Sequence, residues 1–132
     1  MMDILKELGP ARESYRAGDI SSALEMVQAL WDRIPEPRTE EGDAYLVIEY
    51  AVALALKGGR LDVAQRWASE APPFAAKRHD LGEVEFLQGK VAFESGDLQL
   101  ARENFRLAQR KSEGRILEGM AEKYRQLLRE EG

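Results

Sequence analysis

The stretch Gly96-Asp97-Leu98-Gln99-Leu100-Ala101 is the third occurrence of one short pattern in this chain. The first is Gly18-Asp19-Ile20-Ser21-Ser22-Ala23, and the second is Gly59-Arg60-Leu61-Asp62-Val63-Ala64. Each copy has glycine, a polar residue, an aliphatic residue, two variable residues and then alanine. The alanines lie 41 and then 37 residues apart, and recurrence at such a period indicates a repeat architecture.

Each copy of the pattern lies between two segments of helical periodicity, which predicts a turn between paired helices. Glycine tolerates the left-handed conformation that ends a helix, and Asp19 or Asp97 can cap the helix that follows. The small alanine lets that second helix approach its neighbour closely. The middle copy departs most from the pattern, because Arg60 stands where the others have aspartate.

Apolar spacing along the chain predicts an all-α protein. We expect seven helices, at about 4–17, 19–33, 40–57, 61–70, 75–95, 97–111 and 114–130. Pro10 leaves two alternatives: the first helix starts afresh there, or residues 3–8 form a short turn that kinks into it. The segment 40–57 is apolar almost all round, so we expect it to be packed on several sides. The segment 114–130 has one apolar face, which suits the end of a stack.

Length and composition narrow the classes of protein. A chain of 132 residues suits one domain. It has no cysteine, which excludes disulfides, thiolate zinc sites and cysteine nucleophiles and favours a cytoplasmic location. The N-terminal stretch lacks a basic segment and a long apolar segment, so we expect no signal peptide. No apolar run approaches the roughly 20 residues that span a bilayer.

The charge is distributed unevenly. Residues 1–101 carry 11 basic and 18 acidic side chains, whereas residues 102–132 carry 8 and 6. The acidic body disfavours general nucleic-acid binding, which needs clustered lysine and arginine. Arg102, Arg106 and Arg110 form a basic stripe on one predicted helix. The stripe has two interpretations: the solvated outer face of the helix, which we favour, or a docking surface for an acidic partner or RNA.

The segment from Gly82 to Gln109 resembles a tetratricopeptide (TPR) repeat. Residues at that family's spacing are Gly89, Phe93, Gly96, Asp97, Ala101, Phe105 and Ala108. The first repeat matches through Gly18, Asp19, Ala23 and Pro35, and the second through Gly59, Ala64 and Ala71. The second repeat departs at Arg60, and at Ala68, where an aromatic residue is usual.

This resemblance covers nearly the whole chain. It implies a right-handed α-solenoid of about three helix-turn-helix hairpins plus a C-terminal capping helix. The expected organisation is a single TPR-like domain over residues 1–132, with repeats at about 4–35, 40–72 and 75–111 and the capping helix at 114–130.

The resemblance also implies a concave groove lined by the first helix of each pair. A mixed apolar, aromatic and charged lining suits a peptide segment of a partner protein. The residues carried over to this groove are Leu8, Arg12, Tyr15, Arg16, Leu46, Glu49, Ala53, Leu56, Phe86, Lys90 and Phe93.

Several side chains keep two interpretations. Tyr15, Tyr45, Tyr50, Phe86 and Phe93 are either groove anchors or core residues, and we expect two or three to face the groove. Glu49 serves either partner recognition or a structural ion pair, with Arg12 or Lys90 as its partner. The single histidine, His79, has no paired base, nucleophile or further metal ligand beside it in the sequence, so we interpret it as a surface residue.

These observations predict a protein that binds other proteins and is not an enzyme. The first hypothesis is an adaptor or small chaperone that holds a peptide or partner segment in the groove. The alternative is an oligomerising or assembly subunit, or an immunity-type inhibitor, that uses a flat or convex face. We expect no cofactor, metal, small-molecule substrate or membrane, and a homo-oligomer is left open.

Overall fold

The computed structural model describes residues 2–77 and 81–130 of this chain. Within these two ranges the elements are helices and no strand occurs, which confirms the predicted all-α class. The chain divides into two compact units, residues 1–78 and residues 79–132, named here the N-terminal unit and the C-terminal unit. The single domain over residues 1–132 stays a prediction, and His79 lies outside the described residues.

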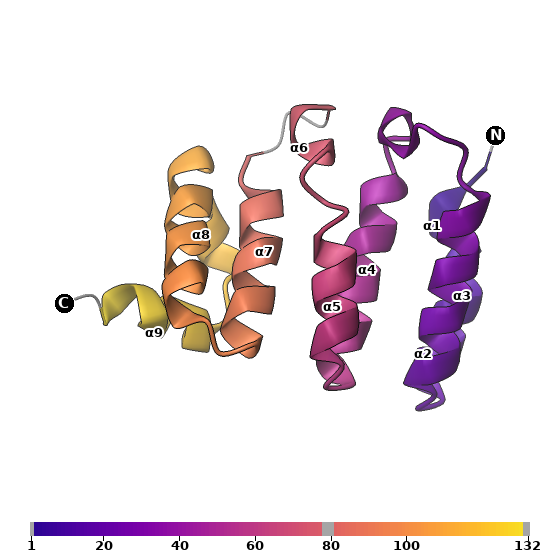
Figure 1. Cartoon of the computed structure of the whole chain (residues 1–132), viewed down its shortest axis with the longest axis horizontal. Helices are drawn as coiled ribbons and strands as arrows, with labels where there is room; N and C mark the ends of the chain where they lie inside the picture. The colour runs from indigo at the N-terminus through magenta and orange to yellow at the C-terminus, as the bar shows by residue number, and fades with distance from the viewer. Residues whose placement is uncertain (1, 78–80, 131–132) are drawn as a thin grey trace. The chain divides into compact units, whose positions relative to one another are not determined.

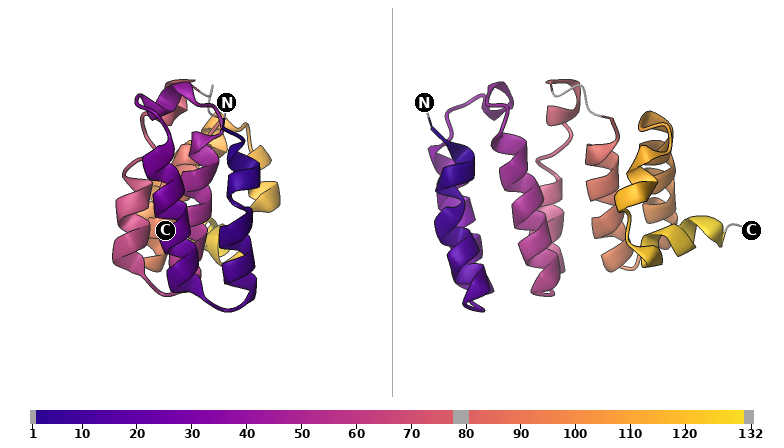
Figure 2. Two further views of the ribbon diagram at one scale, coloured as in Figure 1. Left: turned by 90° about the vertical axis from the view of Figure 1, so that its right-hand side faces the viewer. Right: turned by 180° about the vertical axis from the view of Figure 1, so that it is seen from behind.

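The N-terminal unit consists of two helix pairs with short helical segments around them (Figures 1 and 2). Its elements are α1 Ile4–Glu7, α2 Gly9–Arg16, α3 Ile20–Arg33, η1 Arg38–Glu40, α4 Ala44–Lys57, α5 Leu61–Ala68 and α6 Phe74–Lys77. Helix α2 packs against α3, α4 packs against α5, and α3 contacts α4. The described part of this unit therefore contains both of the predicted hairpins.

Near Pro10 the chain shows features of both predicted alternatives, because a short turn precedes Pro10 and a helix starts afresh beside it. A single turn, α1, is followed by a separate helix, α2, with Pro10 in its first turn. Proline lacks the N–H that would continue the hydrogen-bond ladder of the preceding turn. The predicted helix at 4–17 is therefore two elements that meet at Leu8.

The C-terminal unit holds one helix pair and a C-terminal segment that packs on it. Its elements are α7 Glu83–Glu94, α8 Leu98–Lys111, η2 Arg115–Gly119 and α9 Glu122–Arg129. Helix α7 packs against α8, and both η2 and α9 contact α8. The predicted pair at 75–95 and 97–111 is present, but its first helix is shorter than expected.

The repeated pattern forms the turn in all three helix pairs, as predicted. Gly18, Gly59 and Gly96 adopt left-handed φ angles of 85°, 69° and 89°. The Asp19 and Asp97 carboxylates each accept a hydrogen bond from the backbone N–H three residues later, at 2.9 and 3.1 Å. The side chain of Arg60 makes no such cap, as its departure from the pattern indicated. The three alanines that end the pattern, Ala23, Ala64 and Ala101, are fully buried.

Two predicted helix boundaries are wrong, and at one of them the reason is a glycine. The helix expected at 75–95 is divided into α6 and α7, and Gly82 before α7 has a left-handed φ of 107°. A Cβ at Gly82 would lie 2.7 Å from the Ala108 carbonyl oxygen, so this close approach of the backbone to α8 requires glycine. The helix expected at 40–57 begins only at Ala44, after η1.

The continuous helix predicted at 114–130 is also wrong. Gly114 is left-handed, residues 115–119 form a 3₁₀ turn, and Met120 and Ala121 are extended before α9 begins. The Ser112 hydroxyl accepts a hydrogen bond from the N–H of Ile116 and so supports the 3₁₀ turn. The apolar residues at helical spacing in this segment correctly predicted which side chains are buried, because Met120, Tyr124 and Leu127 share one buried cluster. Their spacing gave no information about the break between them.

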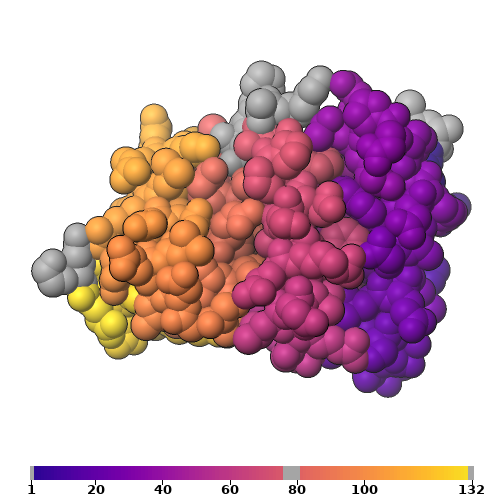
Figure 3. All heavy atoms as spheres, in the orientation of Figure 1, coloured from indigo at the N-terminus to yellow at the C-terminus, as the bar shows by residue number. Residues whose placement is uncertain are grey.

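Aromatic side chains fill the core of the N-terminal unit. The Trp31 and Trp67 rings meet edge to face with centroids 5.5 Å apart, and Phe74 contacts both Trp31 and Tyr45. These contacts join α3, α4, α5 and α6, and Figure 3 shows the side chains of α3 and α5 adjoining on one face. Helix α4 is buried on several sides, as its sequence predicted.

The capping bonds generate the first prediction. Asp97→Ala removes the bond to Leu100 N–H, so we expect the free energy of unfolding to fall by about 1 kcal/mol. Arg60→Ala is the matched control at the equivalent position of the middle turn, where we expect a change below about 0.5 kcal/mol. Urea unfolding followed by far-UV circular dichroism measures both. Equal losses in the two variants would contradict the capping role.

The packing of α7 on α8 generates the second prediction. A Cβ at Gly89 would lie 2.5 Å from Cδ1 and Cε1 of the fully buried Phe105. Gly89→Ala is therefore expected to destabilise by about 1–3 kcal/mol, although alanine favours helix formation by about 1 kcal/mol. Adding Phe105→Leu makes room, so the double variant should lose less stability than the sum of the single variants. Additive losses in urea unfolding would count against the close contact.

Candidate functional site

Residues from α1, α2 and α4 line an open hollow of about 290 Å³ on the N-terminal unit, named here the N-terminal hollow. Leucines form much of its lining, and an arginine, a carboxylate and a phenol add polar groups. Its lining residues are Leu5, Leu8, Arg12, Leu46, Glu49, Tyr50 and Ala53. The hollow therefore combines an apolar lining with both signs of charge.

The break between α1 and α2 shapes this hollow. At the break Leu8 is buried in the core, while Leu5 on α1 stays 47% exposed beside it. The Arg12 guanidinium donates from Nη1 to the carbonyl oxygen of Leu5 at 3.3 Å and lies 5.8 Å from the centroid of the Tyr50 ring. Arg12 thus connects the wall formed by α1 to the wall formed by α4.

Tyr50 is a neutral hydrogen-bonding group at physiological pH. Burial raises the pKa of the Tyr50 phenol, the positive charge of Arg12 opposes the rise, Tyr15 adds to it, and Arg16 opposes it. Tyr15 and Arg16 are therefore close enough to act on the hollow electrostatically, although neither lines it. Arg16 is exposed and pairs with Glu13 at 2.8 Å.

The structure brings together five of the candidate groove residues from the first two repeats: Leu8, Arg12, Leu46, Glu49 and Ala53. Glu49 is half-buried in the same hollow as Arg12. Its two interpretations, partner recognition and a structural ion pair, therefore both stay open. Of the aromatic residues left open by the sequence, Tyr50 lines the hollow and Tyr45 is fully buried core.

Leu5 is a lining residue that the sequence analysis missed. Leu5, Leu8 and Arg12 recur at three and then four residues, which is the spacing of one helix face. That spacing could have indicated Leu5, but the uncertain path of the chain around Pro10 concealed it.

The three candidate residues of the C-terminal unit lie close to the aromatic cluster of that unit. The Tyr124 ring on α9 packs edge to face against Phe93 and Phe86, with centroids 5.0 and 6.4 Å apart. The Lys90 ammonium lies 4.7 Å from the centroid of the Phe86 ring. Phe86 and Phe93 are half-buried and pack against the buried cluster of the C-terminal unit. Both rings therefore contribute to packing, independently of any binding to a partner.

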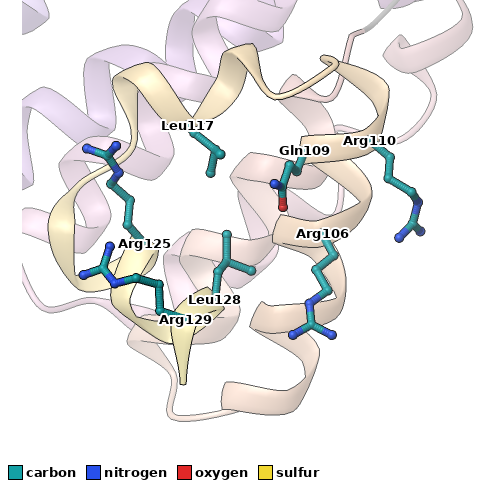
Figure 4. Close-up of a pocket in the computed structure, with 7 residues that line it drawn as sticks. All are labelled: Arg106, Gln109, Arg110, Leu117, Arg125, Leu128 and Arg129. Carbon is teal, nitrogen blue, oxygen red and sulfur yellow. The ribbon is translucent and has the colours of Figure 1, made fainter. Parts of the chain in front are cut away.

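A larger hollow, of about 590 Å³, lies on α8, η2 and α9 in the C-terminal unit (Figure 4). Its lining residues are Arg106, Gln109, Arg110, Leu117, Arg125, Leu128 and Arg129, and it is named here the arginine hollow. Arg106 and Arg110 belong to the basic stripe found in the sequence, whereas Arg102 of that stripe does not line it. The sequence gave no reason to join the stripe to Arg125 and Arg129, because the fold of η2 brings α9 back to α8.

The described residues include no group of three or more histidine, cysteine, aspartate or glutamate side chains that could hold a metal ion. In the same part of the chain, no helix is long and apolar enough to cross a bilayer.

Comparison with protein-family models, with curated proteins and with solved structures gives no significant match for this chain. A function for this protein is therefore inferred from the chemistry of the two hollows. Both offer groups that bind, namely apolar side chains, guanidinium groups and, in the N-terminal hollow, a carboxylate and a phenol.

The environment of Tyr124 generates a third prediction. Burial, then the hydrogen bond that its hydroxyl donates to Glu94 at 3.0 Å, and then the charge of Glu94 raise the pKa of Tyr124. Lys123 also pairs with Glu94, at 2.6 Å. When the pKa of an acid is higher in the folded protein than in the unfolded chain, the fold is stabilised at pH values below the unfolded-state pKa, which is about 10 for tyrosine. This stabilisation is lost as the pH rises through the folded-state pKa.

Tyr124→Phe should therefore lower stability by about 1 kcal/mol near neutral pH, because the bond to Glu94 is lost. The difference between wild type and variant should shrink as the pH rises above about 10. Urea unfolding at a series of alkaline pH values measures this. Parallel pH profiles for the two proteins would show that Tyr124 does not titrate as its surroundings indicate.

Proposed function

We propose that this protein is a non-catalytic protein–protein interaction module, an adaptor or small chaperone that binds a peptide or partner segment. The proposal includes a right-handed TPR-like α-solenoid of three hairpins with a C-terminal cap, a concave binding groove and a cytoplasmic location. Within the N-terminal unit, the N-terminal hollow is the anchor point of that groove. Tyr15, Arg16, Phe86, Lys90 and Phe93 remain predicted groove residues.

The observation that carries the proposal is the composition of the N-terminal hollow. Leu5, Leu8 and Leu46 provide an apolar surface, and Arg12 and Glu49 lie in the same hollow with opposite charges. A peptide backbone and its side chains offer both donors and acceptors to such a pair, while an apolar side chain contacts the leucines. Tyrosine and arginine, which both line this hollow, are the residue types that contribute most to protein interfaces.

The size of the hollow favours a peptide anchor over a small-molecule substrate. Its volume of about 290 Å³ is at the lower limit of the roughly 300–1,000 Å³ typical of small-molecule pockets. One or two anchoring side chains fill that space, and the rest of a bound segment lies outside it. No nucleophile paired with a base lines the hollow.

The fourth prediction tests this site with a matched pair of variants. Leu5→Glu places a charge in the N-terminal hollow, and Met26→Glu places one on α3 outside it; the two side chains are 47% and 40% exposed. Peptides selected against the wild-type protein from a random display library are then measured with each variant by isothermal titration calorimetry. We expect Leu5→Glu to weaken binding at least about tenfold and Met26→Glu to change it less than about twofold.

Two outcomes would overturn the proposed site. Equal weakening by both variants would indicate a nonspecific effect of added negative charge. A wild-type dimer in sedimentation velocity that Leu5→Glu converts to a monomer would indicate that this hollow serves self-association and not peptide binding. Circular dichroism spectra identical to wild type show that the variants remain folded.

A further inference from the structure

The arginine hollow has an apolar floor and a cationic rim. Figure 4 shows the side chains of Leu117 and Leu128 pointing into the hollow from opposite sides, with Gln109 beside them. Both leucines also pack against the buried cluster of the C-terminal unit, so the floor is the outer side of that core. The four guanidinium groups are spread around the rim and do not converge on one point.

The positive charge of the rim is only partly neutralised by neighbouring carboxylates. Arg129 pairs with Glu122, and this hydrogen bond, with the charges of Arg129 and Arg125, lowers the pKa of Glu122. The guanidinium groups of Arg110 and Arg125 form no ion pair or hydrogen bond with any residue in the described ranges. Like charges at this spacing repel one another, so a bound anion is favoured over the empty rim.

The spacing of the four arginines favours several separate carboxylates over a single phosphate group. Arg106 and Arg110 are four residues apart on α8, and Arg125 and Arg129 are four residues apart on α9. Each pair therefore presents two cations on one helix face, about 5–6 Å apart at Cβ. Separate carboxylates along a segment match such a spread, whereas a single phosphate group needs donors that converge on it.

The lining of the hollow disfavours a nucleic acid. None of the seven lining residues is aromatic, and stacking on aromatic rings is the usual source of affinity for single-stranded bases. Two leucines at the centre of the hollow instead match an aliphatic side chain.

We propose that the arginine hollow binds an acidic amphipathic segment of a partner protein. An aliphatic side chain of that segment occupies the floor formed by Leu117 and Leu128, and flanking glutamate or aspartate side chains pair with Arg110 and Arg125 on the rim. This site differs in position and in charge from the N-terminal hollow, so it gives the protein a second binding surface with its own partner chemistry.

The test uses the chain of residues 1–132 and a dye-labelled peptide of about twelve residues in which pairs of Glu alternate with pairs of Leu. Fluorescence anisotropy measures its binding to the wild type, to the double variant Arg110→Gln/Arg125→Gln and to the matched control Lys57→Gln/Arg60→Gln. Both variants remove two positive charges, and the control residues lie in the N-terminal unit. We expect the first to weaken binding at least about tenfold and the control less than about twofold.

Changes in the peptide test the two halves of the proposal separately. Replacing every Glu of the peptide by Gln should remove the salt dependence and most of the affinity. Replacing every Leu by Ser should also weaken binding at least about tenfold, because the floor then has no apolar partner. Leu5→Glu should leave binding of this peptide unchanged, which separates the result from that for the N-terminal hollow.

Four outcomes would overturn the inference. They are equal losses in the two double variants, undiminished binding of the Leu-to-Ser peptide, displacement of the peptide by single-stranded oligodeoxythymidine at equal concentration, and displacement by millimolar inorganic phosphate. Equal losses would show that the effect comes from net charge alone. Undiminished binding of the Leu-to-Ser peptide would show that Leu117 and Leu128 do not hold an aliphatic side chain. Displacement by oligodeoxythymidine or by phosphate would show that the arginines of the rim bind phosphate groups.

Discussion

The close approach of two helices within each pair is the contact on which the rest of this structure depends. Ala23, Ala64 and Ala101 lie in the first turn of the second helix of each pair, and all three are fully buried. The methyl group of alanine allows packing that excludes water. Because alanine has no side-chain conformational entropy to lose, the entropic cost of ordering each pair is low. The left-handed glycine of each turn reverses the chain within a few residues, which brings that alanine against its neighbour.

Much of the fold could be predicted from the sequence because these turns are local. The conformation of Gly18, Gly59 and Gly96 and the caps of Asp19 and Asp97 depend on residues within three positions, so the pattern alone specifies them. The breaks at Gly82 and after Gly119 depend on distant contacts. Gly82 is required because its backbone lies against Ala108. The chain turns at Met120 because its side chain joins the buried cluster on α7 and α8.

The candidate sites could be predicted only in part, for a related reason. Helix spacing and the family resemblance indicated Leu8 and Arg12 on one segment and Leu46 and Glu49 on another, and packing of α2, α3 and α4 brings them together. Sequence spacing says nothing about which faces of distant helices meet. Arg106 on α8 and Arg125 on α9 share a hollow only because η2 is a 3₁₀ turn, whereas a continuous helix was expected there. The two hollows also differ in the charge of their lining residues.

The single turn of α1 has a consequence for the shape of the N-terminal hollow. Only four residues long, it is held by the Asp3 cap, by burial of Ile4, by the bond from Arg12 to the Leu5 carbonyl and by the ion pair of Glu7 with Arg33 on α3. So short a helix has little cooperative stability of its own, so its position depends on these contacts with the rest of the N-terminal unit. One wall of the N-terminal hollow is therefore set by a few side-chain contacts, whereas the opposite wall belongs to α4, a helix of 14 residues buried on several sides.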